Sequence, residues 1–258
     1  MSHRASEKYF KKISMNAPEK SFLVNRLINV NNYKSYLELG TNDAFSPKSM
    51  FYHIQCENKF GVDRLFKTDY TGDAQDFLNQ NDKKFDCIYI DCDYSFEGSY
   101  QLAFQSKDAL NKGGVILMNF ADPLSKEWQT EKPGNNWIGQ VWKTVVKLHH
   151  SSDQSFDAVI IKNTGNSDGR PQSVLPLDEA EGMTHGLAVL RVFPKNSKNK
   201  EEKKKDQVNK FDDKLLDYSF YEKNKSDIMN IVSVKDFFSE YCTYEQHLES
   251  SRQFWSKK

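Results

Sequence analysis

Short apolar runs and amphipathic stretches alternate along the first 150 residues of the chain. The apolar runs at residues 36–39, 59–63, 85–91 and 115–118 are typical of buried strands. Between them apolar side chains recur at helical spacing, most clearly over residues 95–110. Strands that alternate with helices predict right-handed crossovers, and therefore an α/β fold with a mostly parallel, Rossmann-like sheet and helices on both faces.

Further elements are predicted before, between and after these strands. Residues 16–19 are typical of a helix start, and the Ser-Pro pair at 46 and 47 predicts a second helix that continues to about residue 55. Residues 138–148 again have helical spacing. The apolar runs at residues 158–161 and 187–192 predict late strands that add an antiparallel edge to the sheet.

A strongly charged segment divides the second half of the chain. Residues 195–205 consist of lysines and glutamates among small polar residues, which is typical of a solvated loop. Beyond this segment, helical apolar stripes alternate with charged positions. We predict a Rossmann-like domain over residues 1–194, a charged solvated loop over 195–210, and a helical C-terminal extension over 211–258 that packs on the main domain.

Composition narrows the class of protein. The chain has 258 residues, of which 38% are hydrophobic, and a formal net charge of zero, which suits a folded globular protein. There is no basic excess of the kind that nucleic-acid-binding proteins carry. The sequence has no membrane-spanning apolar stretch and no apolar signal segment at its start. We expect a soluble cytoplasmic protein without nucleic-acid or membrane partners; a homo-oligomer or a protein partner stays open.

Three strand ends carry residues suited to a ligand site. In an open parallel sheet, ligands bind outside the carboxyl ends of the strands, where Gly40, Asp63 and Asp91 are predicted to lie. A glycine turn lets the backbone approach a ligand closely, and the following helix offers its amides. Asp63, about 20 residues further on, is placed to accept hydrogen bonds from ribose hydroxyls. The pattern predicts a nucleoside cofactor, although Gly40 also suits any tight turn and Asp91 any helix cap.

The glycine content separates two classes of cofactor. A dinucleotide needs a GxGxxG turn for its pyrophosphate, whereas residues 40–45 contain one glycine, which disfavours NAD. S-adenosylmethionine has no phosphate, and its ammonium and sulfonium groups suit acids such as Glu38, Asp43 and Asp91. The residues therefore favour S-adenosylmethionine over a nucleotide-dependent oxidoreductase.

Several sequence motifs of the chain have a family likeness: YLELGTNDAFS, GVDR with the later GDAQDFL, FDCIYIDCDYSFEGSY, LNKGGVILMNFADP, and the ending LDYSFYEKNKSDIMNIVSVKDFF. They resemble those of class I S-adenosylmethionine-dependent methyltransferases, in a variant found among bacterial cell-surface sugar and small-molecule methyltransferases. The likeness covers mainly residues 33–148, with a weaker one near the C-terminus.

The resemblance implies roles for individual residues. The methionine part of the cofactor would lie against residues 38–43, the ribose against Asp63, the adenine beside Asp73 and Ala74, and the sulfonium and acceptor near Asp91, Asp93 and Tyr94. The cofactor-binding residues expected on this basis are Glu38, Gly40, Thr41, Asp43, Asp63, Arg64, Asp73, Ala74, Asp91 and Tyr94.

The expected reaction is O-methylation of a small molecule or glycan unit. Asp91 and Asp93 are the candidate catalytic residues, because burial can raise the pKa of a carboxyl group until it serves as a base. No metal is assigned, although Asp91, Asn119 and Asp122 offer oxygen ligands that suit magnesium. The histidines, His185 among them, are expected to have structural roles.

One departure from the family pattern bears on activity. The family usually has a His-Asp pair after the strand that corresponds to residues 115–118, and this chain has Asn119-Phe120 there. An alternative function is therefore that of a catalytically inactive methyltransferase-like protein, acting as an interaction or scaffold module.

Overall fold

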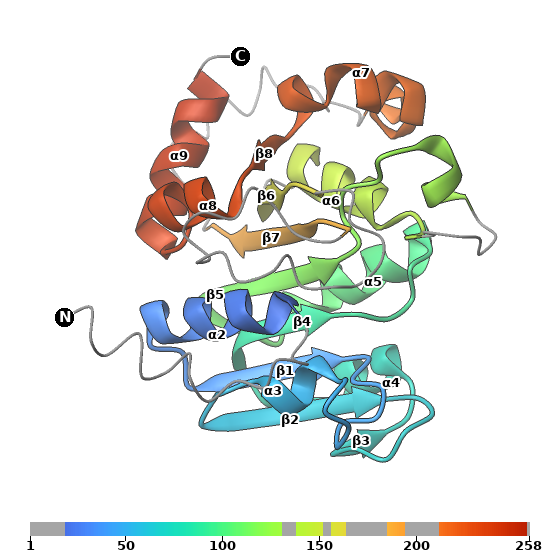
Figure 1. The fold of residues 1–258 in the computed structure, drawn as a ribbon, viewed down its shortest axis with the longest axis vertical. Helices are drawn as coiled ribbons and strands as arrows, with labels where there is room; N and C mark the ends of the chain where they lie inside the picture. Colours follow the sequence, from blue (N-terminus) through green and yellow to red (C-terminus); the bar gives the residue numbers. More distant parts are fainter. Residues whose placement is uncertain (1–18, 131–137, 152–155, 164–184, 194–211, 257–258) are drawn as a thin grey trace, which may run out of the picture.

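One eight-stranded sheet organises the part of the chain that the computed structural model describes, which comprises residues 19–130, 138–151, 156–163, 185–193 and 212–256. The strands follow the order β3-β2-β1-β4-β5-β7-β6-β8 (Figure 1). Their bounds are β1 (Ser35–Leu39), β2 (Asn58–Asp63), β3 (Tyr70–Thr71), β4 (Phe85–Ile90), β5 (Leu110–Asn119), β6 (Phe156–Ile161), β7 (Leu187–Val192) and β8 (Asn230–Val232).

The parallel strands bring their carboxyl ends to one edge of the sheet. Leu39 of β1 lies beside Val62 of β2 and Ile90 of β4, and Ile90 in turn lies beside Met118 of β5. The residues that follow these four positions therefore lie at the same level. The predicted mostly parallel, Rossmann-like fold class is confirmed.

The sequence pattern predicted an antiparallel strand at the edge of the sheet. In the structure the antiparallel strand lies inside the sheet. β7 pairs antiparallel with both β5 and β6, while β8 pairs parallel with β6 and forms the edge. β7 comes after β6 in the chain and runs antiparallel to it, as consecutive neighbouring strands commonly do. It therefore lies between β5 and β6, which run in the same direction. The three-residue strand β8, within the segment predicted to be helical, has too little apolar pattern to be found from sequence.

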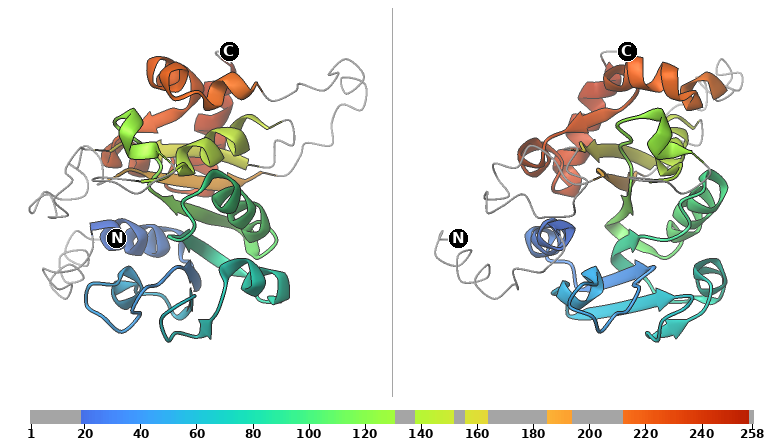
Figure 2. Two further views of the ribbon diagram at one scale, coloured as in Figure 1. Left: turned by 90° about the vertical axis from the view of Figure 1, so that its right-hand side faces the viewer. Right: turned by 45° about the vertical axis from the view of Figure 1, so that its right-hand side comes forward.

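Helices cover both faces of the sheet (Figure 2). One face packs against α4, α5, α6 and α7, and the other against α2, α3, α8 and α9. The bounds are α2 (Glu19–Asn31), α3 (Met50–His53), α4 (Ala74–Gln80), α5 (Phe96–Ser106), α6 (Val141–His150), α7 (Tyr218–Ile228), α8 (Val234–Glu240) and α9 (Tyr244–Ser256), with 3₁₀ turns at Lys126–Gln129 and Asp213–Leu216.

The alternation of side chains along β1 determines which residues reach the core and which reach the site. Leu37 and Leu39 belong to the core cluster beneath α4, α5 and α6, whereas Tyr36 packs with α2 and α3 on the opposite face. Successive side chains of a strand point to opposite faces, so Glu38 shares the face of Tyr36. A buried carboxylate therefore lies at the end of β1.

The helix predicted from residue 46 is much shorter in the structure. α3 begins only at Met50, because the chain first forms a turn in which Ser46 N donates to Asp43 O. Ser49, at the N-cap position, does not cap the helix but donates its hydroxyl to Thr41 O at 2.8 Å. A loop therefore replaces the long helix N-terminus that was expected to offer amides to a ligand.

Two further expectations concern the charged segment and membrane-spanning helices. The charged segment 195–210 lies outside the described residues, so the proposed domain division stays a prediction. In the described parts of the chain, none of the helices has both the length and the apolar composition that a bilayer crossing requires.

Candidate functional site

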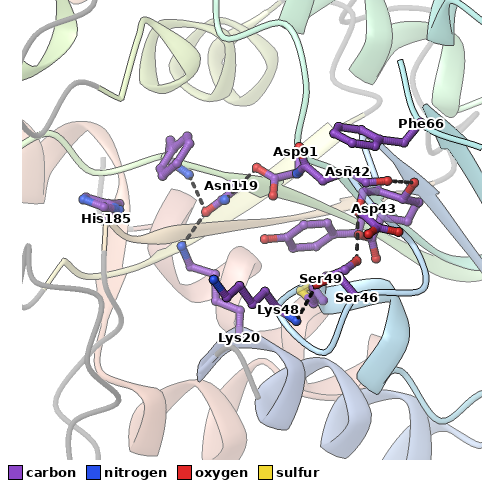
Figure 3. A pocket seen from close by; sticks show the side chains of 15 residues that line it. Lys20, Asn42, Asp43, Ser46, Lys48, Ser49, Phe66, Asp91, Asn119 and His185 are labelled. Atoms are coloured by element: carbon purple, nitrogen blue, oxygen red, sulfur yellow. Dashed lines mark hydrogen bonds between the residues drawn. The ribbon is translucent and has the colours of Figure 1, made fainter. Parts of the chain in front are cut away.

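A cavity of about 550 Å³ opens at the carboxyl ends of β1, β4 and β5 (Figure 3). This is the edge of a parallel sheet at which ligands bind. Its walls are formed by Lys20, Glu38, Thr41, Asn42, Asp43, Ser46, Lys48, Ser49, Met50, Phe66, Tyr89, Asp91, Asn119, Phe120 and His185. Of the predicted site residues, Glu38, Thr41, Asp43 and Asp91 are among them.

Glu38 is a buried acid at the end of β1. Its carboxylate accepts a hydrogen bond of 2.5 Å from the hydroxyl of Tyr36. Burial raises the pKa of Glu38 to about 8; the hydrogen bond from Tyr36 opposes this rise, and the neighbouring charge of Asp91 adds to it. At neutral pH the carboxyl group therefore holds a proton much of the time, and a cationic ligand would favour its ionised form.

Asp91 follows β4 and forms the centre of a polar cluster. Its Oδ1 accepts from Asn119 Nδ2 at 2.7 Å and from the hydroxyl of Tyr94 at 3.0 Å. Burial raises the pKa of Asp91, while the hydrogen bond from Asn119, the charge of Lys20 and the hydrogen bond from Tyr94 oppose that rise. Asp91 also lines the cavity, which places its carboxyl group where a ligand could reach it.

Lys20 approaches the same cluster from α2. Its Nζ donates to Asn119 Oδ1, which also accepts from Phe120 N at 2.9 Å. Lys20 is only 8% exposed, and its Nζ lies 5.5 Å from the centre of the Phe120 ring. A lysine 99 residues away in sequence from its partner gives no local signal, and sequence reasoning missed it.

Phe120 and His185 complete the wall beyond Asn119. Both have left-handed backbones, with φ of 62° and 61°, a conformation that side chains with a Cβ rarely adopt and that concentrates at functional sites. Burial, with the charge of Lys20, lowers the pKa of His185 to about 4, so the ring is neutral at neutral pH. Its Nε2 is buried without a hydrogen-bond partner among the described residues. His185, expected to be structural, therefore faces the cavity (Figure 3).

Asp63 does not line the cavity, and the structure gives its carboxylate another task. One oxygen accepts from Asn42 N at 2.7 Å, and the other accepts from Leu65 N at 2.8 Å and Phe66 N at 3.0 Å. These bonds tie the loop after β1 to the loop after β2. Asp63 thereby positions Phe66, which does line the cavity; its contact with a ribose stays a prediction.

Gly40 is required by the packing of two strands. Its φ is 93°, and a Cβ built there would lie 2.5 Å from the carbonyl oxygen of Asp91. No larger residue fits where the end of β1 passes the end of β4. Gly40 itself is not among the cavity residues, so this need for glycine is explained without a ligand.

The remaining predicted residues lie at helix starts or at the surface. Asp73 caps α4 by accepting from the amides of Gln75 and Asp76, and Ala74 is the first residue of that helix. Arg64 and Asp93 are exposed. Asp93 accepts from Ser95 Oγ at 2.7 Å at the start of α5, and none of these four residues lines the cavity.

The three oxygen-bearing residues considered for magnesium do not come together. Asp122 accepts from Asn163 N at 2.7 Å and lies 3.4 Å from Lys225 Nζ. Asp91 and Asn119 instead bond to each other. Over the described residues, no cluster of three or more histidine, cysteine or acidic side chains is arranged to hold a metal ion.

Comparison with known proteins gives matches among solved structures alone. No protein-family model and no curated protein matches the chain. The O-methyltransferase TomG from Streptomyces achromogenes, in complex with SAM, is 15% identical over 68% of this chain and 80% of its own, with a TM-score of 0.46. An O-methyltransferase from Bacillus cereus, in complex with SAH, is 14% identical over 73% and 88%, also at 0.46. DesVI from Streptomyces venezuelae is 12% identical over 75% and 99%, at 0.44.

These similarities are too weak to establish a function. Sequence identity and TM-score are both low for each of the three structures. The cavity and its chemistry must therefore support any assignment.

Proposed function

We propose that this chain is an S-adenosylmethionine-dependent methyltransferase that methylates an oxygen atom of a small molecule or glycan unit. One observation carries the proposal: Glu38 and Asp91, at the neighbouring ends of β1 and β4, face one cavity with raised pKa values. Two acids beside each other repel when both are ionised, and a ligand with positive charge relieves that repulsion. The ammonium and sulfonium groups of S-adenosylmethionine provide such charge.

The donor set fits this cofactor better than a dinucleotide. The loop over residues 40–49 has one glycine and leads into a helix of four residues, so it offers neither a glycine-rich phosphate cradle nor a long helix N-terminus. Asp43, Glu38 and Asp91 instead place carboxyl groups along the cavity. S-adenosylmethionine, when bound, supplies an electrophilic methyl group to the acceptor.

The residues of the chain orient the reactants and move a proton. Methyl transfer needs donor and acceptor held at near-attack distance, which a walled cavity at a sheet edge provides. Asn119 and Tyr94 fix Asp91 through Oδ1, and the raised pKa makes the carboxylate a stronger proton acceptor. We assign Asp91 as the base for the acceptor hydroxyl. Asp93, held at the start of α5, is the weaker candidate.

Cofactor binding and turnover together test the proposal. Isothermal titration calorimetry with S-adenosylhomocysteine should give saturable binding, and NAD in the same cell should give none. Incubation with S-adenosylmethionine and a library of hydroxyl compounds should then produce S-adenosylhomocysteine. Binding without any turnover would favour the inactive scaffold that Asn119-Phe120 suggested. No binding up to millimolar concentration would overturn the methyltransferase proposal.

A further inference from the structure

Two loops beside the cavity expose large apolar side chains to water. The loop after β1 presents Phe45, which is 72% exposed, and the loop after β2 presents Leu65 and Phe66, which are 83% and 43% exposed. β1 and β2 are neighbours in the sheet, and a single carboxylate, that of Asp63, accepts hydrogen bonds from backbone amides of both loops. The three apolar side chains therefore belong to one patch at the carboxyl edge of the sheet, which we call the loop patch.

The aromatic rings of the loop patch lack the contacts that another exposed ring of the protein has. Phe104, which is also exposed, stacks on Tyr100 and lies near the ammonium group of Lys107. Among the described residues, neither Phe45 nor Phe66 contacts another ring or a cation. Exposed apolar surface is unfavourable in water, and where several such side chains gather they mark an interaction site more often than a single one does.

Basic side chains accompany the apolar ones. Arg64 and Lys67 come directly before and after the apolar pair of the second loop, and Lys48 lies in the first loop; all three are exposed. None of their side chains forms a hydrogen bond or an ion pair within the described parts of the chain. The loops thus present three cations that are free to meet an anionic partner.

The acids of the same loops are turned toward the backbone. Asp63 is buried and bonds to three amides. Asp69 accepts from Gly61 N at 2.8 Å, and Asp43 accepts from Phe45 N at 3.2 Å and borders the cavity. Lysine and arginine instead carry their charge at the end of a long side chain, so a partner that approaches the loops meets the cations first.

We propose that the loop patch rests on the surface of a bilayer that contains anionic lipids, with its apolar side chains in the interfacial region and its cations at the headgroups. Phenylalanine and leucine combined with lysine and arginine are the residues by which proteins bind such surfaces. A protein partner fits less well, because the centre of a protein interface is depleted of lysine. A surface contact needs no membrane-spanning segment, so this inference departs from our expectation that the protein has no membrane partner.

The contact brings the cavity to the bilayer surface. Phe66 and Lys48 belong to the two loops and also line the cavity (Figure 3). A molecule that is anchored in the bilayer by a lipid can therefore reach the cavity from the membrane side. The surface contact does not depend on the reaction in the cavity, and it stands apart from the methyltransferase proposal.

Vesicle co-sedimentation tests the role of the loop patch. The full-length protein is mixed with vesicles of phosphatidylcholine alone or of phosphatidylcholine with phosphatidylserine, and the bound fraction is measured. We expect binding to the mixed vesicles, which salt weakens by screening the charges. Leu65→Ser and Phe45→Ser should each bind about tenfold more weakly, because the apolar area that enters the bilayer is lost. Lys67→Gln should bind about fivefold more weakly.

Matched control variants change side chains at the opposite edge of the sheet. Val30→Ser and Lys112→Gln remove an exposed apolar and an exposed basic side chain near the starts of β1 and β5, and both should bind the mixed vesicles as the wild type does. Urea denaturation should give wild-type stability for every variant, because each changed side chain is exposed. Calorimetry with S-adenosylhomocysteine on the same samples reports separately on the methyltransferase proposal.

Three results would each overturn the membrane contact. The first is no sedimentation of the wild type with the mixed vesicles. The second is equal binding of the wild type and Leu65→Ser. The third is a wild-type dimer in analytical ultracentrifugation that Leu65→Ser converts to a monomer, because the loop patch would then join two copies of the chain.

Discussion

Two aspartates next to strands of the sheet, one partly buried and one buried, have opposite pKa shifts. Asp91 follows β4 and borders the cavity, with one oxygen bonded and a raised pKa. Asp157, near the start of β6, lies 3.2 Å from His149 and 2.9 Å from His247. Burial alone would raise its pKa too, but the hydrogen bonds from the two histidines hold that pKa well below its usual range.

The two acids differ in their surroundings: Asp91 lines a cavity and has a raised pKa, whereas Asp157 is paired with histidines and has a lowered pKa. Both carboxylate oxygens of Asp157 have partners. Oδ1 lies 3.2 Å from His149 Nδ1 and 3.4 Å from Trp255 Nε1, and Oδ2 lies 2.9 Å from His247 Nε2. His247 and Trp255 belong to α9 and His149 to α6, so this cluster fixes the C-terminal helix on the sheet. An acid that lines a cavity with a raised pKa is a candidate for ligand binding, and a fully paired acid is not.

Asp91→Asn should produce the largest effect on ligand binding. The variant keeps the shape and removes the charge that faces the cavity, so the affinity for S-adenosylhomocysteine should fall by about 100-fold. Because burial disfavours the charged form of Asp91, the free energy of unfolding should be unchanged or higher. Calorimetry and urea denaturation measure the two effects. Unchanged affinity for S-adenosylhomocysteine would contradict the proposed role of Asp91 in cofactor binding.

Asp157→Asn should give the opposite result. Loss of a buried charge that holds two histidines should lower the free energy of unfolding by about 3 kcal/mol. Cofactor affinity should remain within a few-fold of the wild type, because the cluster lies at the other end of the sheet. Urea denaturation at pH 7 checks the stability. A variant with normal stability and weakened cofactor binding would reverse the roles that we assign to the two acids.

Asp63→Ala should have moderate effects on both cofactor affinity and the free energy of unfolding. Three backbone amides lose their acceptor, which should cost about 2 kcal/mol of stability and weaken cofactor binding about tenfold, as the loops that carry Asn42 and Phe66 loosen. Urea denaturation and calorimetry again measure both. Full stability combined with lost affinity would show that Asp63 contacts the ligand and does not act through the loops.

The two clusters should also respond oppositely to acid. Burial lowers the pKa of His247 below its usual 6.5 although Asp157 opposes this, so the unfolded chain binds the proton first and stability falls as the pH drops below about 6.5. Glu38 and Asp91 have raised pKa values in the folded chain, so proton uptake by these acids adds stability as the pH falls. Glu38, with a pKa of about 8, contributes over the whole interval from pH 7 to 5.5. Glu38→Gln lacks this gain, so its free energy of unfolding in urea denaturation should fall more steeply over this interval than that of the wild type, by about 1.4 kcal/mol per pH unit. Equal slopes for both proteins would contradict this.

The parts of the site that could be predicted lie next to strand ends. Glu38 and Asp91 were found because a buried strand and the acid at its end are adjacent in sequence, and the parallel register brings such ends together. The same reasoning found the sheet itself, since each strand carries a local apolar run. It misplaced β7, whose antiparallel position inside the sheet depends on pairing with two distant strands.

The opposite case is the part of the cavity wall that comes from segments far apart in sequence. Lys20, Phe120 and His185 come from α2, the end of β5 and the turn before β7, and only the tertiary fold brings them together. The pattern also does not distinguish an acid that faces a ligand from one that bonds to backbone amides, as Asp63 and Asp73 do; their contact with a cofactor stays a prediction.

A crystal structure of the protein soaked with S-adenosylhomocysteine tests the central claim most directly. The account predicts electron density for the ligand in the cavity between Glu38 and Asp91, with the amino and thioether groups on the side of these acids and the space beside Lys20 and Phe120 left for the acceptor. Density bound elsewhere on the chain, or an empty cavity at saturating ligand, would contradict it.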